Sequence, residues 1–290
     1  MKSIVRIMAE RMKGGEISIH KYLKNNSVEL HGISIMNSDT NMRPNIYLES
    51  YYEKYKEGVS VEDIADEIIE VYNQCEQNSD VIDINEFNFD TIQDRITFRL
   101  VSKEKNKKVL EEIPYIEFLD MAIIFYVLVN QDSYGVGSVR INNDMIREWG
   151  INHVTLMHLA GENTPRLFPA KFVDLMELVK ELDGMSNNEL ELHKSSQVFV
   201  LTNEIGINGS GCILYKNILK EIADKMKSNI YILPSSIHEV LILPYEQGLS
   251  YEKITNMITQ VNYTVVNYED ILTDHPYIYI RKTGKIEYKK

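Results

Sequence analysis

Hydrophobic and polar positions along the chain follow two periods, one typical of helices and one of strands. After Ser60 the apolar residues recur at helical spacing, and Ser60 with Asp63 forms a capping-box-like pair, so a helix is predicted to begin there. Residues 3–12 are also predicted to be helical. Residues 28–36 and 95–101 are predicted as strands, because their apolar positions alternate or run together.

The centre of the chain is predicted to hold a β-hairpin followed by short helices. Residues 115–119 and 121–129 are strand-like, and residues 136–141 follow a turn rich in polar residues and glycine. Helices are expected at 143–149 and 153–160. This part of the chain is therefore expected to mix helices and strands.

The next segment, Asn163–Pro169 (NTPRLFP), contains two prolines. A proline restricts the residue before it to extended conformations, so the segment is predicted to be an ordered turn and not part of a helix. Pro169 is then expected to open a helix whose apolar face runs from Phe172 to Leu182.

Residues 184–196 (GMSNNELELHKSS) form the candidate linker between a mixed region, 1–183, and a C-terminal domain, 197–290. Within that domain the predicted element order is β-α-β-β-α-β-β. Helices inserted into a mainly antiparallel sheet indicate an α+β class. The predicted elements are strands at 197–202, 230–233 and 240–243, helices at 213–226 and 250–261, and a hairpin over 277–288.

Three segments make the chain resemble a known family. They are the NTPRLFP segment, the ILPSSIHE segment at 232–239 and the ending VNYTVVNYEDILTDHPYIYIR at 261–281. Together they resemble an uncharacterised bacterial domain-of-unknown-function family, found largely in anaerobic gut Gram-positive bacteria. From residue 121 onward the element order is similar, more distantly, to YtpQ-like proteins of bacilli. The resemblance implies a bacterial cytoplasmic protein and brings no catalytic residue.

Charge and composition exclude some classes of partner. The 290 residues carry a formal charge of −12 and no long basic stripe, so general nucleic-acid binding and adhesion to anionic membranes are not expected. Cys75 and Cys212 are the only two cysteines, fewer than a disulfide scaffold of this size would carry, so a reducing compartment is expected. The N-terminal residues lack the apolar core of a signal peptide, and the apolar run 121–129 is shorter than the roughly 20 residues of a spanning helix. A cytoplasmic location without membrane crossing is therefore expected.

Ser235, Ser236, His238 and Glu239 are the densest group of reactive side chains. On an extended segment Ser236 and His238 share a face, and Glu239 points the other way. A catalytic serine needs a base within about 2.6–3.2 Å, which neighbouring strand positions rarely provide. The alternative, a turn whose serines bond to the backbone, is favoured.

Cys212 is the second candidate nucleophile, because it follows a glycine-rich turn at the predicted start of a helix, where a thiol pKa falls. His238 could lie near it through the sheet. The alternative is a small buried core residue.

The glycine-rich turn could also bind an anion, with Asn203, Glu204 and Gly209 lining the site. It matches no nucleotide motif, and glycines that merely permit a tight turn are the favoured interpretation. Arg166 could grip a carboxylate or phosphate, although bonds to carbonyls ending the preceding helix are favoured. No metal spacing and no cofactor motif occurs.

Three functions remain open. The first is a non-enzymatic protein-binding or regulatory module, of a kind that a mobile element can encode, motivated by the acidity and the tyrosine-rich C-terminal sheet. The second is a hydrolase or transferase using Cys212 or Ser236 with His238, and the third is a small-ligand sensor. Binding ranks first, so we lean away from an enzyme. The oligomeric state is left open.

Turns 203–212 and 234–239 are expected at the ends of one sheet, and a site there requires that they meet.

Overall fold

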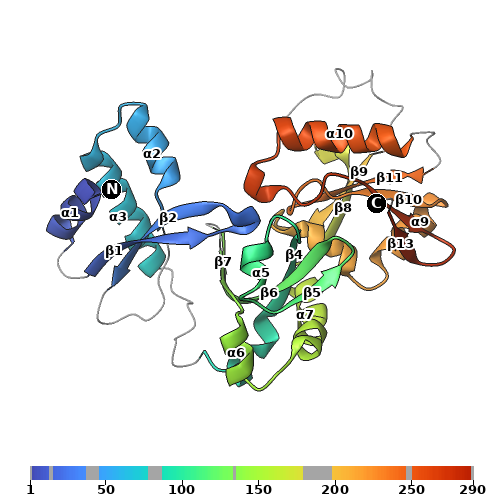
Figure 1. Cartoon of the computed structure of the whole chain (residues 1–290), viewed down its shortest axis with the longest axis horizontal. Coiled ribbons are helices and arrows are strands. Elements are labelled where there is room, and N and C mark those ends of the chain that lie inside the picture. Colours follow the sequence, from blue (N-terminus) through green and yellow to red (C-terminus); the bar gives the residue numbers. More distant parts are fainter. Residues whose placement is uncertain are drawn as a thin grey trace. The chain divides into compact units, whose positions relative to one another are not determined.

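The chain folds as an α+β protein, as predicted, and its sheets are mainly antiparallel. The computed structural model describes residues 2–12, 16–36, 46–77, 87–132, 135–178, 198–245 and 250–288. They form two compact units (Figure 1). One comprises residues 1–93 with 128–139, and the other comprises 94–127 with 140–290.

In the first unit, helices pack on a three-stranded sheet of order β1-β2-β3. The predicted helix after Ser60 is confirmed, since the Asp63 N–H donates to Ser60 Oγ at 3.1 Å. The core joins Met8, Ile35 and Ile68, all at most 1% exposed. The elements are α1 (Lys2–Arg11), β1 (Glu16–Leu23), β2 (Glu29–Met36), β3 (Ile46–Tyr47), α2 (Glu49–Lys56) and α3 (Val61–Gln77).

A second sheet pairs β6 with β4 on one side and with β5 and β7 on the other. The predicted hairpin in the centre of the chain is therefore confirmed. The elements of this stretch are α4 (Phe89–Ile92), β4 (Ile96–Ser102), α5 (Lys107–Leu110), β5 (Tyr115–Phe118), β6 (Met121–Asp132), β7 (Gly135–Arg140), α6 (Asn143–Glu148) and α7 (His153–Leu167).

The prediction of a turn at Asn163–Pro169 was wrong, because α7 continues through Pro165 to Leu167. Hydrogen bonds to β4 fix this last turn: Asn163 Nδ2 donates to the Ile96 carbonyl at 3.1 Å, and Thr164 Oγ1 accepts from the Phe98 N–H at 3.0 Å. These tertiary bonds outweigh the helix-breaking tendency of one proline.

The prediction that a helix begins at Pro169 was also wrong, because Ala170–Asp174 forms strand β8. Phe172 pairs with Leu201 of the neighbouring strand and stacks on Phe199, with ring centroids 5.1 Å apart. Pairing with a distant strand therefore overrides the helical spacing of the apolar residues.

The C-terminal part forms a six-stranded sheet of order β13-β12-β10-β11-β9-β8. Its predicted β-α-β-β-α-β-β succession is confirmed. The helix expected at 213–226 is shorter, since a 3₁₀ turn, η5 (Gly209–Leu214), precedes it and Asn217 is left-handed. The elements after β8 are β9 (Phe199–Asn203), α9 (Ile218–Met226), β10 (Ile230–Leu233), β11 (Val240–Pro244), α10 (Tyr251–Thr264), β12 (Tyr277–Ile280) and β13 (Lys285–Glu287).

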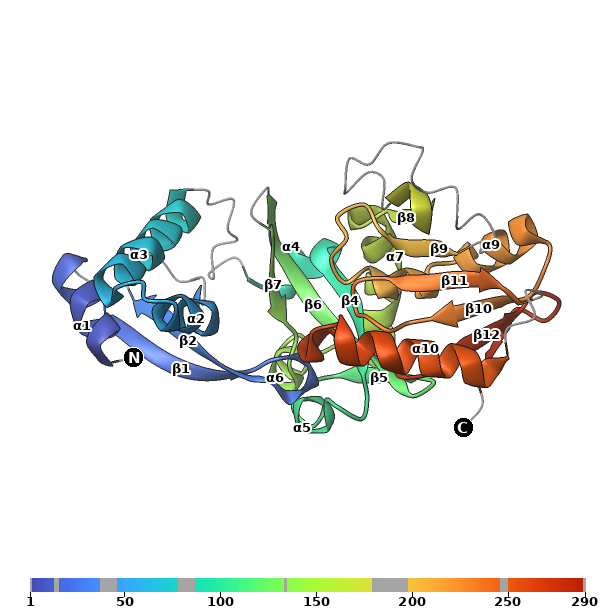
Figure 2. The same ribbon diagram turned by 90° about the horizontal axis from the view of Figure 1, so that it is seen from above.

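Helix α10 lies along one face of this sheet (Figures 1 and 2). Ile254 and Ile258 pack on Tyr231 and Leu233 of β10. The expected helix cap is present, since the Lys253 N–H donates to Ser250 Oγ at 3.3 Å. Side chains alternate across a strand, so Ile230 and Ile232, also buried, face the opposite side.

The candidate linker 184–196 lies outside the described residues, and the division into 1–183 and 197–290 stays a prediction. On either side of the linker, β8 and β9 are adjacent strands of one sheet. Within the described part of the chain, no helix combines the length and apolar character needed to cross a membrane.

Candidate functional site

The two turns that the sequence placed at the ends of one sheet do meet. The Asn208 N–H donates to His238 Nδ1 at 3.3 Å, and the Ser210 N–H donates to the Ile237 carbonyl at 3.2 Å. Thr202 Oγ1 donates to the His238 carbonyl at 2.8 Å. The turn after β9 and the β10–β11 connection therefore form one hydrogen-bonded unit.

Gly209 permits this close approach. A Cβ at Gly209 would lie 2.2 Å from Thr202 Oγ1 and 2.6 Å from the His238 carbonyl oxygen. These distances are shorter than any van der Waals contact, so a side chain here would force the two turns apart. The glycine is present because the backbones touch, in agreement with the turn interpretation.

Asn203 builds the turn from within. Its Oδ1 accepts from the N–H groups of Ile205 and Gly206 at 3.1 and 2.8 Å, and its Nδ2 donates to the Ile207 carbonyl at 2.8 Å. The Glu204 N–H donates to the Pro169 carbonyl at 3.0 Å, and the Glu204 side chain is exposed. Asn203 thus acts on its own backbone.

Both ring nitrogens of His238 have partners. The Asn208 N–H donates to Nδ1 at 3.3 Å, and Nε2 contacts Asp270 Oδ1 at 3.2 Å. Each nitrogen is therefore committed to a group other than Ser236 or Cys212. A nucleophile could be activated by His238 only after one of these bonds breaks.

Ser236 and Glu239 complete what we call the His238 cluster, with His238 and Asp270. Ser236 is buried, and its Oγ accepts the His238 N–H at 3.0 Å and also bonds to Glu239. Burial raises the pKa of the Glu239 carboxyl, while His238 and Ser236 partly oppose that rise. Ser236 thus bonds to the backbone of His238 and to the side chain of Glu239, and not to the His238 ring.

Cys212 is fully buried, within η5. Its thiol contacts the Thr202 carbonyl at 3.2 Å. Burial raises the pKa of this thiol to about 11, which is the opposite of what a nucleophilic cysteine needs. The local geometry is that of a core residue.

Arg166 sits in the last turn of α7 and bonds to the protein itself. One of its terminal nitrogens, Nη2, donates to the Asp94 carbonyl at 2.7 Å and to Asn163 Oδ1 at 3.1 Å. The expected carbonyl partner exists, although it lies in the segment before β4 and not at the end of the helix preceding Arg166.

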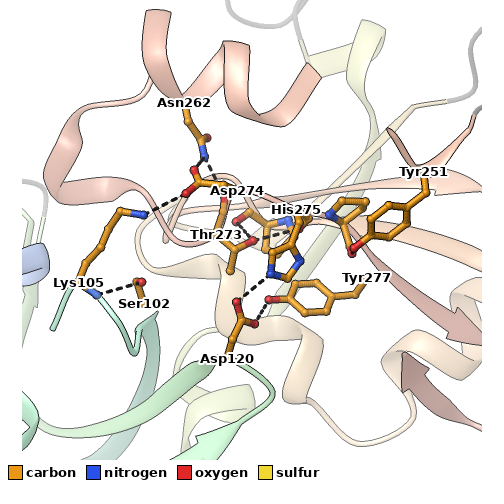
Figure 3. A network of polar contacts seen from close by, with 11 residues as sticks. Ser102, Lys105, Asp120, Tyr251, Asn262, Thr273, Asp274, His275 and Tyr277 are labelled. Atoms are coloured by element: carbon orange, nitrogen blue, oxygen red, sulfur yellow. Dashed lines mark hydrogen bonds and ion pairs between the residues drawn. The ribbon is translucent and has the colours of Figure 1, made fainter. Parts of the chain in front are cut away.

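A second polar cluster, absent from the sequence predictions, lies around His275. Asp120 accepts from two donors: its Oδ2 lies 2.9 Å from His275 Nε2, and its Oδ1 accepts from the Tyr277 hydroxyl (Figure 3). The His275 ring also stacks on Tyr288, with centroids 5.2 Å apart and planes 6° apart. We call Asp120, His275, Tyr277 and Tyr288 the His275 cluster.

Electrostatics fix the charges of this cluster. Burial raises the pKa of Asp120, but the hydrogen bonds from His275 and Tyr277 outweigh it and hold that pKa below its usual value. The hydrogen bond to Asp120 raises the pKa of His275, against the effect of burial. Burial and the same carboxylate raise the pKa of Tyr277. Asp120 is therefore an anion that favours a protonated His275.

A strained turn presents Asp120. Phe118 and Met121 pair across the β5–β6 hairpin, which leaves Leu119 and Asp120 as a two-residue loop. Leu119 has a φ of 60°, in the left-handed region that a leucine rarely occupies. Such strain persists only where the surroundings impose it, and here the loop is tied down through Asp120.

Reasoning from sequence missed the His275 cluster because its acid and imidazole come from distant segments. The one local signal was an Asp-His pair, Asp274 and His275, set between apolar segments close to a strand. That pattern marks His275 as half-buried, but it does not identify Asp120. No group of three or more His, Cys, Asp or Glu side chains suited to a metal ion occurs among the residues that the structure describes.

Exposed apolar side chains of the second unit concentrate in one stretch of sequence, the second half of α10 and the residues that follow it. In the described residues ten large hydrophobic side chains are exposed, and five of them lie between 257 and 268. Scattered exposed apolar residues are normal, whereas neighbouring ones form a patch of the kind that partners cover. Met257 and Val261, four residues apart on α10, share one face of the helix. We call this group the α10-end surface. It comprises Met257, Val261, Tyr263, Val265 and Tyr268.

Comparison with known proteins places the chain in a family. It belongs to a family of unknown function, DUF5688, whose model matches residues 1–281. The predicted resemblance to an uncharacterised family is thereby confirmed. No curated protein and no solved structure matches the chain.

Proposed function

We propose that this protein is a non-enzymatic binding module that recognises another protein through the α10-end surface. The observation that carries the proposal is the concentration of exposed apolar side chains there: Tyr263 is 91% exposed and Val265 is 76% exposed. Leaving such groups in water is unfavourable by about 25 cal/mol per Å², so a partner that covers them gains that free energy.

Charge favours a basic partner. Glu269 directly follows the α10-end surface in sequence, and the whole chain carries −12. Electrostatic complementarity speeds association and selects partners. We therefore infer a protein whose contact region has an apolar centre and a rim rich in Lys and Arg.

The internal bonding of the candidate nucleophiles supports binding over hydrolysis or group transfer. Ser236 Oγ is bonded to the His238 N–H and to Glu239, and the Cys212 thiol is buried beside a carbonyl. Both groups have the contacts of structural residues. The side chains of the α10-end surface, in contrast, are exposed and contribute little buried area to the fold.

The test is affinity purification of the tagged full-length chain from its native host. Val265→Asp introduces a charge at the α10-end surface, and Val154→Asp is a matched control, because Val154 is also 76% exposed but lies on α7. We expect wild type and Val154→Asp to recover the same basic protein, and Val265→Asp to recover at least about tenfold less of it. Equal recovery by Val265→Asp, or no reproducible partner, would contradict the proposal.

A further inference from the structure

Helix α10 is fastened near both ends to the segment that precedes β12. At its first residue, the Tyr251 hydroxyl donates to the Pro276 carbonyl at 3.1 Å. In its last turn, Asn262 Nδ2 donates to the Thr273 carbonyl and to Asp274 Oδ1, both at 2.8 Å. The position of α10 on the sheet therefore depends on residues 273–276.

The same segment is held from its other side by the β4–β6 region. Asp120 binds His275, and Lys105 Nζ contacts Asp274 Oδ2 at 3.3 Å (Figure 3). Thr273 reaches the β10–β11 connection, since its N–H donates to the Pro234 carbonyl at 3.1 Å. Residues 273–276 thus link α10 to two separate elements.

His275 is the one group in this link that titrates near neutral pH. Four titratable groups face it: Asp120 from the β5–β6 turn, Asp274 beside it, Tyr277 from β12 and Tyr288 after β13. Two are carboxylates, and Tyr277, whose pKa is raised by burial, is neutral near pH 7. The surroundings therefore favour the imidazolium, whose bond to Asp120 is charge-assisted and stronger than that of the neutral ring.

We propose that Asp120, His275 and Tyr277 form a proton-dependent latch that fixes residues 273–276, and through them α10, to the β5–β6 turn. With His275 protonated the latch is tight. When the proton leaves, the ion pair becomes a weaker hydrogen bond from a neutral ring to the Asp120 carboxylate, while the Tyr277–Asp120 bond persists. The latch acts within the second unit and does not depend on the protein-binding proposal.

The sign of the pH dependence follows from the pKa shift. Because the folded pKa of His275 is raised, its contribution is fully present below the unfolded value of about 6.5 and is lost as pH rises through the folded value. Asp120 has a lowered pKa, so its contribution is present above about 3.8 and is lost as pH falls through the folded value. The latch is therefore tightest between these limits.

Amide hydrogen exchange in α10 of the full chain tests the latch. His275→Gln should speed exchange over 251–264 by about tenfold relative to wild type at pH 5.5, and by clearly less at pH 8.5. Tyr277→Phe should speed it by a similar factor at both pH values, because the tyrosine does not titrate there. His158→Gln, which changes an exposed histidine on α7, is the control and should leave α10 exchange unchanged.

Two outcomes would overturn the latch. One is a His275→Gln effect on α10 that is absent or equal at both pH values. The other concerns the wild-type chain and needs no variant to fold: NMR titration of the imidazoles should give His275 a pKa above the ordinary 6.5. A His275 that titrates at or below that value contradicts the proposal.

Discussion

The His238 and His275 clusters each pair a histidine with an aspartate, but they are built differently. Asp270 is 32 residues from His238, and the other ring nitrogen of His238 is bonded to the backbone of a neighbouring turn. Asp120 is 155 residues from His275, and its two oxygens receive side-chain donors from one segment. The first cluster joins turns at one end of a sheet. The second joins a helix-bearing segment to another sheet.

The difference shows that reactive residue types do not by themselves indicate chemistry. In the His238 cluster, backbone N–H groups and the Asp270 and Glu239 carboxyls occupy the atoms that catalysis would need. In the His275 cluster, the aspartate creates a charged pair whose strength varies with pH. Perturbation of the first should therefore act through packing, and perturbation of the second through charge.

The largest effect is expected from Gly209→Ala, which breaks the contact between the two turns beside His238. The added Cβ overlaps Thr202 Oγ1 and the His238 carbonyl, so unfolding free energy should fall by about 3 kcal/mol. Gly161→Ala is the matched control, because Gly161 lies in α7 with open space around it and alanine favours a helix. Urea unfolding of both variants measures this, and equal effects would contradict the close approach.

The thiol beside that contact should be unreactive. At pH 8 a pKa of about 11 leaves far less thiolate than an ordinary cysteine has, so labelling of Cys212 in native protein should be at least about a hundredfold slower than in urea. The measurement uses Cys75→Ser, which leaves Cys212 as the sole cysteine. Rapid labelling of the native variant would restore the nucleophile hypothesis.

Asn262→Asp is expected to weaken the attachment of α10 to residues 273–276 by placing a second negative charge beside Asp274. The new carboxylate loses the amide donors to Thr273 and Asp274 and lies beside the Asp274 carboxylate, which should cost about 2 kcal/mol at pH 7. The loss should shrink below pH 4, as carboxyl groups protonate. Gln260→Glu makes the same chemical change at an exposed position of α10, and chemical denaturation at both pH values should detect little effect from it.

The smallest effect is expected from Glu239→Gln. Because burial raises the folded pKa of Glu239, ionising it disfavours the native state, and this penalty appears as pH rises above about 4.5. The variant should therefore be more stable than wild type at pH 7, by roughly 0.5 kcal/mol, and equal to it near pH 4. Thermal unfolding at the two pH values measures this. A variant less stable at pH 7 would mean that the charged carboxylate is needed.

Local signals predicted the elements whose structure is set by nearby residues. The caps at Ser60 and Ser250 and the C-terminal element order required only spacing and side-chain type. Failures occurred where distant partners decide. Pro165 stays helical because Asn163 and Thr164 bond to β4, and Phe172 joins a strand because Leu201 lies opposite.

The candidate sites divide in the same way. The turns 203–212 and 234–239 could be placed together because strands β9, β10 and β11 bring them to one end of the sheet. The pairing of Asp120 with His275 could not be inferred, since no period or motif connects positions 155 residues apart. The α10-end surface could not be predicted from the sequence either, because which side chains of α10 are exposed depends on how the helix packs on the sheet.

The central claim is that function resides in the exposed surface of α10 and not in the serine and cysteine of the neighbouring turns. The most direct measurement is the Kd of the copurified partner for Tyr263→Ala and for Ser236→Ala. Tyr263 is 91% exposed and Ser236 is buried, so the first change barely affects the fold. The account predicts at least about tenfold weaker binding for Tyr263→Ala and unchanged binding for Ser236→Ala. Unchanged binding by Tyr263→Ala with loss in Ser236→Ala would contradict it.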